Sequence, residues 1–472
     1  MLRTKIICSL GPASSSPEIV QAMVEGGMSM ARIAMTHGDH AEHRAHIEAV
    51  RAAAAKARRP VAVLADLGGP KIRVGDMAEP MGLRVGERAV MAPAGSAGPG
   101  EIPTTYAPLA EEIEPGRRVL LDDGLLELVC TSTDGDRVIL EVVRGGLLTR
   151  GKGINLPEVD VRAPSLTDKD LADLEFVLGM GVEYVALSFV RKAADVTDLK
   201  ERVGGRALVV AKIEKVQALH AIEDILAETD AVMVARGDLG AELPFERVPL
   251  AQKRIIQLAN YYARPVITAT QMLESMIGKP RPTRAEASDV ANAILDGTDA
   301  VLLTGETTVG AYPLEAVDAL ARIAREIERS GVLERGPRYL TPPGIRGRGG
   351  ATPREHAVAA ATVDAVRSLE APAILVFTHS GSSARLVSSY RPPVPVFALT
   401  TDPLTYRQLA AVWGVVPVLA DVGCDTYEAL MDVGREAVIR SGAGDPGAPV
   451  VVTAGFPFHL AGTTNTMRVE RL

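Results

Sequence analysis

One pattern recurs through the first two thirds of this 472-residue chain: a short apolar run rich in β-branched residues, a loop, and a segment with helical periodicity. Eight such runs occur, at residues 4–9, 28–34, 61–66, 184–189, 207–214, 231–236, 266–270 and 300–304. Strands that alternate with helices form parallel sheets with right-handed crossovers, and continuous apolar runs are typical of strands covered on both faces. The pattern therefore predicts the α/β class and a closed (β/α)8 TIM barrel.

The repeat is interrupted between residues 70 and 162, where no helical periodicity is visible. Short strand-like pieces in this segment are separated by Asp-Gly and Gly-Gly turns, so we expect an inserted small β-barrel domain. Residues 1–69 and 163–333 would then form the barrel, and together they have the usual length of one TIM barrel. The Pro- and Gly-rich residues 334–353 predict a linker, and residues 354–472 predict a C-terminal α/β domain.

Charge, hydropathy and cysteine content exclude several kinds of protein. The chain has 59 acidic and 51 basic residues and a net charge of −8, which argues against a nucleic-acid-binding protein. No apolar stretch is long enough to cross a membrane, so we expect no membrane partner. The three cysteines, Cys8, Cys130 and Cys424, are widely separated, which excludes a disulfide scaffold and indicates a cytoplasmic protein.

Polar residues occur where the predicted strands end, which is the face of a TIM barrel that carries the active site. These residues are Arg32, Asp66, Lys212, Glu214, Arg236, Asp238, Thr270, Gln271, Thr304 and Glu306. Any one of them could be a helix cap or a solvated side chain. Six strand ends with such groups at one mouth favour a functional site there.

Glu214 and Asp238 form the strongest pair in this set. Two carboxylates on adjacent strand ends, with no His or Cys nearby, offer the oxygen ligands that suit Mg2+ or Mn2+. Lys212 lies two residues before Glu214, so both side chains leave the strand on the same face. A cation beside a metal carboxylate can stabilise an enolate or a transferring phosphoryl group. The alternative is a structural Lys–Glu pair on the surface.

Two other motifs are weaker. His37, His40, His43 and His46 recur every three residues but lack an H-E-x-x-H carboxylate, so we expect His40–His46 to lie on an exposed helix and to bind no metal. The loop 378–383 lies between an apolar strand and an expected helix, where backbone N–H groups and hydroxyls form either a phosphate site or an ordinary helix cap. Its candidate contacts are Thr378, Ser380, Gly381, Ser382 and Ser383.

Nine segments in order along the chain resemble the motifs of the pyruvate kinase family, and together they span nearly the whole sequence. They are ARIAMTHG at 31–38, DLGGPKIR at 66–73, GINLP at 153–157, AKIE at 211–214, VARGDLG at 234–240, TATQMLESM at 268–276, RPTRAE at 281–286, TGET at 304–307 and TNTMRV at 464–469.

The resemblance implies transfer of the phosphoryl group of phosphoenolpyruvate to ADP, which yields pyruvate and ATP in glycolysis. It implies that Lys212, Arg32 and Thr270 are catalytic and that Glu214 and Asp238 hold Mg2+ or Mn2+. The further contacts that it implies are Arg32, Lys212, Gly237, Asp238 and Thr270 for the substrate, and Arg73, Lys152 and His37 for the nucleotide phosphates.

The chain departs from the family pattern at the potassium site. Where family members use Asn, Ser, Asp and Thr, this chain has Ala34, Thr36, Asp66 and Leu67, so two side-chain oxygens are lost. Where potassium-requiring members carry Glu, it has Lys71. The Lys71 ammonium can supply the missing charge, so the resemblance to the Lys-bearing subgroup implies activity without K+.

The resemblance also implies a lid role for the inserted domain, allosteric regulation by a sugar phosphate or nucleoside monophosphate at the loop 378–383, and a homotetramer. Two alternatives stay open. A metal-dependent aldolase or lyase that releases pyruvate would share Lys212, Glu214 and Asp238 but would not need the insert or Arg73. A metabolite sensor with an inert barrel would not need intact catalytic residues.

Overall fold

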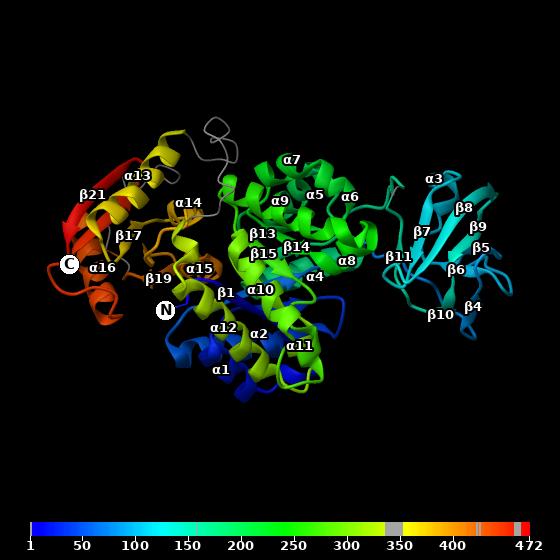
Figure 1. The fold of residues 1–472 in the computed structure, drawn as a ribbon, viewed down its shortest axis with the longest axis horizontal. Helices are drawn as coiled ribbons and strands as arrows, with labels where there is room; N and C mark the ends of the chain where they lie inside the picture. Colours follow the sequence, from blue (N-terminus) through cyan, green and yellow to red (C-terminus); the bar gives the residue numbers. More distant parts are fainter. Residues whose placement is uncertain (1, 158, 336–352, 422, 424–425, 457–463) are drawn as a thin grey trace.

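The computed structural model describes residues 2–157, 159–335, 353–421, 423, 426–456 and 464–472. Three bodies lie along the long axis of the molecule, with the barrel in the middle, the β insert at one end and the C-terminal domain at the other (Figure 1). No helix among the described residues is long and apolar enough to cross a membrane.

The central body is a closed barrel of eight parallel strands. In chain order they are β1 (Lys5–Ser9), β2 (Met28–Ala34), β3 (Ala62–Asp66), β12 (Tyr184–Leu187), β13 (Leu208–Ile213), β14 (Ala231–Ala235), β15 (Val266–Ala269) and β16 (Ala300–Leu303). The pairing of β16 with β1 closes the barrel. Each strand lies inside one of the eight apolar runs, which confirms the predicted fold class.

Helices surround the barrel, and several begin at residues that cap them. They are α1 (Pro17–Gly26), α2 (His40–Ala57), α4 (Asp168–Gly179), α5 (Ala193–Val203), α6 (Val216–His220), α7 (Ile222–Glu228), α8 (Arg236–Glu242), α9 (Val248–Tyr261), α10 (Arg284–Asp296), α11 (Gly305–Thr308) and α12 (Pro313–Arg329). Asp39, Thr167 and Thr283 each accept a backbone N–H at the start of a helix, which satisfies donors that the helix itself leaves unpaired. The sequence therefore places the loops that lead into α2, α4 and α10.

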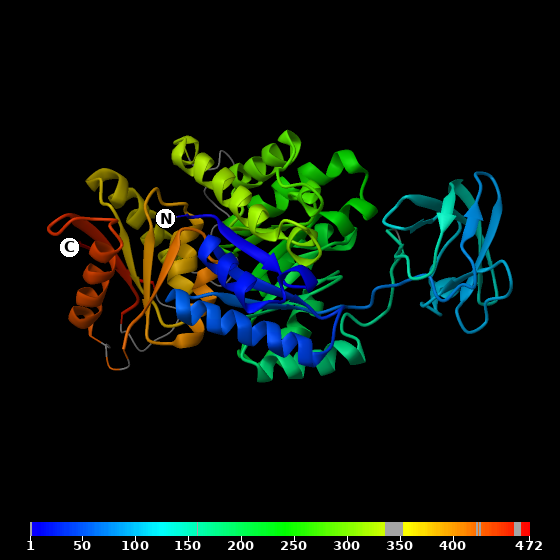
Figure 2. The same cartoon turned by 90° about the horizontal axis from the view of Figure 1, so that it is seen from below.

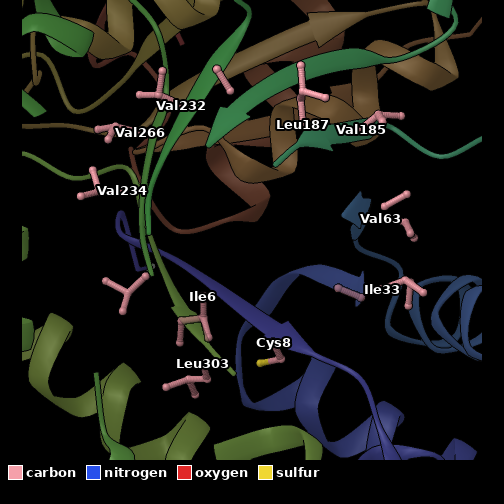
Figure 3. Packing of buried hydrophobic residues seen from close by; sticks show 14 of the residues in the cluster. Ile6, Cys8, Ile33, Val63, Val185, Leu187, Val232, Val234, Val266 and Leu303 are labelled. Carbon is pink, nitrogen blue, oxygen red and sulfur yellow. The ribbon is translucent and has the colours of Figure 1, made fainter. Parts of the chain in front are cut away.

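The strands are apolar on both faces because each face meets a different layer. Alternate residues such as Ile6 and Cys8 point outward and pack against the helices, as Figure 3 shows for the strand side chains of this layer. The intervening residues, such as Ile7 and Leu64, fill the inside of the barrel. This double burial explains why the runs lack polar alternation.

The insert has its own hydrophobic core and is joined to the barrel by two chain segments (Figure 2). Its six-stranded sheet comprises, in spatial order, β11 (Ile154–Asn155), β7 (Arg118–Leu121), β8 (Leu126–Asp134), β9 (Arg137–Arg144), β5 (Arg88–Pro93) and β6 (Ile102–Thr104). A two-stranded sheet of β4 (Met81–Leu83) and β10 (Gly146–Leu148) and the short helix α3 (Leu109–Glu112) complete it.

The C-terminal domain contains a five-stranded sheet between helices. Its strands, in spatial order, are β19 (Val415–Leu419), β18 (Val396–Thr400), β17 (Ile374–Phe377), β20 (Pro449–Ala454) and the antiparallel β21 (Thr466–Arg471). Its helices are α13 (Pro353–Leu369), α14 (Ser382–Ser389), α15 (Pro403–Gln408) and α16 (Tyr427–Arg440). Most of the predicted linker, residues 334–353, lies outside the described residues.

The C-terminal domain packs against the end of the barrel where the strands begin. Lys5, the first residue of β1, donates from Nζ to the Val415 carbonyl at 2.8 Å. The Tyr184 hydroxyl, at the start of β12, donates to the Gln408 carbonyl at 2.7 Å. The insert lies beyond the opposite end of the barrel, where the strands finish (Figure 1).

Candidate active site

A chain of ion pairs joins the ends of β2, β3 and β13. Arg32 Nε donates to Asp66 Oδ2 at 2.7 Å, and its Nη1 donates to Ser9 Oγ at 2.9 Å. Lys212 Nζ lies 3.3 Å from Asp66 Oδ1 and 2.8 Å from Glu214 Oε1. The structure thus brings together three predicted site residues and Asp66, and all four side chains are largely buried.

The charges in this cluster determine each other's protonation. Burial alone would raise the pKa of Asp66, but Lys212 and Arg32 outweigh it and hold that pKa below its usual value. Burial opposes the charge of Lys212, but Asp66 and Glu214 outweigh it and raise the pKa of the ammonium. Lys212 is therefore a cation at every physiological pH, and Asp66 is an anion.

The pKa of Glu214 is shifted in the opposite direction to that of Asp66. Burial raises its pKa above the usual range, the neighbouring Asp238 carboxylate raises it further, and Lys212 opposes both effects. Glu214 directly follows β13, and Asp238 lies in the first turn of α8, which begins directly after the neighbouring strand β14. Two carboxylates at adjacent strand ends are stabilised when a cation lies between them.

The donor set fits a hard divalent cation. Glu214 Oε2 accepts the Phe189 N–H at 2.8 Å, whereas Oε1 is buried and has only the ion-pair contact with Lys212, without hydrogen-bond geometry. Asp238 is about a quarter exposed, so its carboxylate is accessible from the mouth. The described residues contain no group of three or more His, Cys, Asp or Glu side chains that could cage a metal. Two carboxylates completed by water and substrate oxygens are the usual arrangement for Mg2+.

Thr270 follows β15 directly and faces the start of α8. Its Oγ1 accepts the Gly237 N–H at 2.8 Å and donates to the Ala269 carbonyl at 2.7 Å. The loops after β14 and β15 therefore meet at the mouth, as the prediction for Gly237, Asp238 and Thr270 requires.

Two residues near Lys212 escaped the sequence analysis. Ser188, directly after β12, accepts a hydrogen bond from Lys212 Nζ at 2.7 Å and donates to the Leu67 carbonyl at 2.7 Å. Phe189 holds Glu214 through its backbone N–H. Ser188 could have been predicted, because it is a polar residue at a strand end like the residues that were predicted. The role of Phe189 could not, because the contact is made by its backbone N–H and not by its side chain.

Models of this family match the chain in two parts. The model described as "Pyruvate kinase, barrel domain" matches residues 1–317, and the model described as "Pyruvate kinase, alpha/beta domain" matches residues 356–470. The chain belongs to the pyruvate kinase family. The resemblance seen in the sequence is thereby confirmed, and the chain is a phosphotransferase.

Relatives in this family match along their full length or most of it. The pyruvate kinase of Mycobacterium intracellulare is 45% identical over 475 residues, which cover 100% of this chain and 98% of the relative. The pyruvate kinase of Mycobacterium tuberculosis H37Rv is 43% identical over the same length and coverage. The pyruvate kinase of Geobacillus stearothermophilus is 41% identical over 476 residues, which cover 99% of this chain and 80% of the relative.

The predicted nucleotide contacts of this chain lie in two places. Arg73 and Lys152 are neighbours on the two segments that enter and leave the insert, where Val74 donates to the Lys152 carbonyl at 2.8 Å. Arg73 Nη1 donates to the Gly151 carbonyl at 2.9 Å, and Lys152 Nζ lies 2.9 Å from Asp122 Oδ1. His37 is exposed after β2 and has no hydrogen bond or ion pair with either residue among the described parts of the chain.

The prediction of an exposed histidine face was wrong in part. His43 is buried in α2, because its side of the helix faces the barrel. The His40 ring stacks on Phe176 with 4.2 Å between centroids, and its Nε2 lies 2.8 Å from Asp173 Oδ1. These contacts explain His40 by packing between α2 and α4.

The C-terminal loop forms a tight turn before α14. Gly381 has a φ of 76° and donates its N–H to Thr378 Oγ1 at 3.0 Å. Ser380 Oγ donates to Ser382 Oγ at 3.1 Å, and Ser383 Oγ shares a 2.7 Å hydrogen bond with Thr464 Oγ1. The loop brings its predicted contacts together, although most of their hydroxyls already have partners.

Proposed function

We propose that the chain transfers the phosphoryl group of phosphoenolpyruvate to ADP and so forms pyruvate and ATP in glycolysis. The observation that carries this proposal is the buried Lys212 ammonium, held between Asp66 and Glu214 and beside Arg32. A fixed cation of this kind suits a reaction in which a P–O bond to an enol oxygen breaks and a P–O bond to the nucleotide forms. Such transfers depend on positioning and charge neutralisation rather than on covalent catalysis.

The contacts of Arg32 and Lys212 support the roles that we propose for them. Arg32 is oriented by Asp66 and Ser9, so its remaining N–H groups are free to bind the substrate phosphate. Lys212 stabilises the negative charge of the transferring group and of the enolate. The enolate then takes a proton at carbon to become pyruvate, and we assign no residue as the donor beyond a water near Thr270.

Glu214 and Asp238 would hold Mg2+ or Mn2+, which supplies charge neutralisation for the phosphoryl oxygens when it is bound. Gly237, Asp238 and Thr270 would bind the substrate carboxylate through backbone N–H groups and the Thr270 hydroxyl. Arg73, Lys152 and His37 would meet the nucleotide phosphates. Closure of the insert over the mouth would exclude water and protect the phosphoryl group from hydrolysis.

Potassium independence is part of this proposal. Lys71 Nζ lies 3.3 Å from Asp238 Oδ1, which supports a fixed ammonium at the mouth. Ala34 and Leu67 provide no side-chain oxygen for a monovalent cation. Activity should therefore persist when tetramethylammonium replaces K+, and a collapse of the rate under that exchange would refute this part of the proposal.

Regulation and assembly are the last parts of this proposal. The turn of residues 378–383 is a candidate site for a sugar phosphate or a nucleoside monophosphate, and Arg385 is tied to it by a 3.1 Å hydrogen bond to the Ser380 carbonyl. Membership of the family supports a homotetramer, and the scattered cysteines support a cytoplasmic location. Titration of each effector class against the rate, and sedimentation of the purified chain, test these points.

The central experiment is pyruvate formation from phosphoenolpyruvate and ADP with Mg2+, detected by coupling to lactate dehydrogenase, with and without K+. We expect ADP-dependent pyruvate formation in both salts. Pyruvate formation that does not depend on ADP would indicate a lyase instead. No turnover at all, together with effector binding to the C-terminal domain, would indicate a sensor.

A further inference from the structure

Two consecutive residues at the mouth have a backbone conformation that side chains disfavour. Thr270 has a φ of 67° and Gln271 has a φ of 53°, so both lie in the left-handed region. For a β-branched residue such as Thr this is a rare conformation, because the branched side chain crowds the backbone. It persists only where the surrounding structure holds it in place, and such residues concentrate at functional sites.

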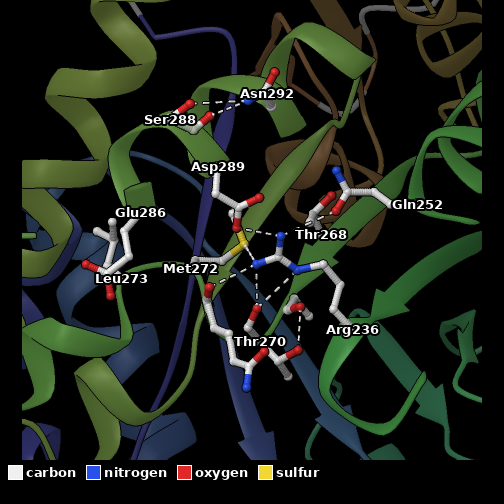
Figure 4. A network of polar contacts seen from close by, with 12 residues as sticks. Arg236, Gln252, Thr268, Thr270, Met272, Leu273, Glu286, Ser288, Asp289 and Asn292 are labelled. Carbon is white, nitrogen blue, oxygen red and sulfur yellow. Dashed lines mark hydrogen bonds and ion pairs between the residues drawn. The ribbon is translucent and has the colours of Figure 1, made fainter. Parts of the chain in front are cut away.

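The Arg236 side chain binds the backbone of both residues. Its Nη2 donates to the Thr270 carbonyl at 2.7 Å and to the Gln271 carbonyl at 3.0 Å, and its Nε lies 3.2 Å from the Thr270 carbonyl. Figure 4 shows the guanidinium lying against this turn. One planar group thus binds the carbonyls of both left-handed residues.

Arg236 is itself held from the other side. Its Nη1 lies 2.6 Å from Asp289 Oδ2 on α10 and 3.4 Å from Gln252 Oε1 on α9 (Figure 4). The Arg236 side chain is only 10% exposed, whereas that of Asp289 is 38% exposed. The guanidinium is therefore held between α9, α10 and the turn after β15.

We infer that Arg236 is a positioning residue that keeps Thr270 in its substrate-binding conformation, with Asp289 as its anchor. The residue after Arg236 completes the arrangement, because the Gly237 N–H donates to the Thr270 hydroxyl at 2.8 Å. Residues 236 and 237 thus hold Thr270 at its carbonyl and at its hydroxyl. This inference rests on the proposed function, in which Thr270 binds the carboxylate of phosphoenolpyruvate.

The test compares Arg236→Lys with a matched control. Lysine keeps the charge but loses the planar fork that reaches two carbonyls and Asp289 together. Arg264→Lys is the control, because Arg264 also donates to two consecutive carbonyls, those of Leu226 and Ala227, at the other end of the barrel. We expect Arg236→Lys to raise the KM for phosphoenolpyruvate about tenfold or more, with the KM for ADP unchanged. Arg264→Lys should leave both constants unchanged.

A second pair of variants separates positioning from general stability. Asp289→Asn keeps Arg236 but weakens its anchor at a partly exposed site, so it should fold and should show the same selective rise in KM to a smaller extent. In a Thr270→Ala background, Arg236→Lys should add little, because Arg236 acts through Thr270. A purely structural role would instead lower the amount of folded enzyme and leave both KM values as they are.

These measurements separate failure of the inference from failure of the proposed function. If the wild type is active and Arg236→Lys and Asp289→Asn keep the wild-type KM for phosphoenolpyruvate, the inference is overturned and the proposed function stands. The inference is also overturned if Arg236→Lys raises the KM for phosphoenolpyruvate by the same factor in the wild type and in the Thr270→Ala background. If the wild type and Arg264→Lys form no pyruvate, the proposed function fails and the inference fails with it.

Discussion

The buried amine of Lys5 makes the stability of this protein depend on pH in a defined window. Lys5 lies at the junction of the barrel and the C-terminal domain, where Nζ donates to the Val415 carbonyl at 2.8 Å. Burial, helped by the charge of Arg59, lowers the pKa of Lys5 from 10.5 to about 8. The folded protein therefore disfavours a proton that the unfolded chain accepts readily.

The sign and the size of the effect follow from this shift. Between pH 8 and 10.5 the unfolded chain binds more protons at Lys5 than the folded protein does, so the free energy of unfolding rises with pH. Each unit of pKa difference corresponds to ~1.4 kcal/mol, so the total gain across the window is about 3 kcal/mol. The gain is complete above pH 10.5 and is lost as the pH falls through 8. Lys5→Met removes this pH dependence. Its other effects on the free energy of unfolding do not vary with pH.

Denaturant unfolding at pH 7, 8, 9 and 10 measures the effect. Trp413 is the only tryptophan of the chain and lies two residues before Val415, so its fluorescence reports on this junction. The wild type should gain stability relative to Lys5→Met as the pH rises from 8 to 10. Lys56→Met, at an exposed position on α2, should remain parallel to the wild type. If the free energy of unfolding changes with pH in the same way for Lys5→Met and the wild type, Lys5 is charged in the folded protein and the reasoning is wrong.

Three further predictions concern the domain junction and the mouth. Arg391→Met should lower the free energy of unfolding by about 3–5 kcal/mol, because it leaves the buried Asp299 without the partner that now lies 3.0 Å away. As a control, Arg435→Met breaks an exposed ion pair and should change the denaturation midpoint little. Lys212→Ala should lower kcat by about 10^3 or more in the coupled assay, and a loss below tenfold would contradict its role. Lys71→Glu should create a requirement for K+, measured by KCl titration at constant ionic strength, and activity that ignores K+ in this variant would contradict the ammonium-substitution argument.

Much of the site could be predicted because strand ends in a barrel converge whatever the side chains are. Arg32, Lys212 and Glu214 lie near the ends of apolar runs, so their placement at one mouth needed only the recognition of a closed barrel. Ser188 carried the same signal and was overlooked. The burial of His43 was not predicted, because a three-residue spacing does not reveal which side of a helix faces the barrel.

The amino-acid sequence by itself determined the eight-stranded barrel, the position of the insert and the residue types at the mouth, because apolar periodicity and turn chemistry act over a few neighbouring residues. Only the tertiary structure decided how those residues hold one another. The left-handed Thr270, the Arg236 side chain that binds it from 34 positions away and the Phe189 N–H on Glu214 depend on backbone dihedrals and on contacts between separate strands. Such contacts form only when the barrel closes, and no local pattern encodes their geometry.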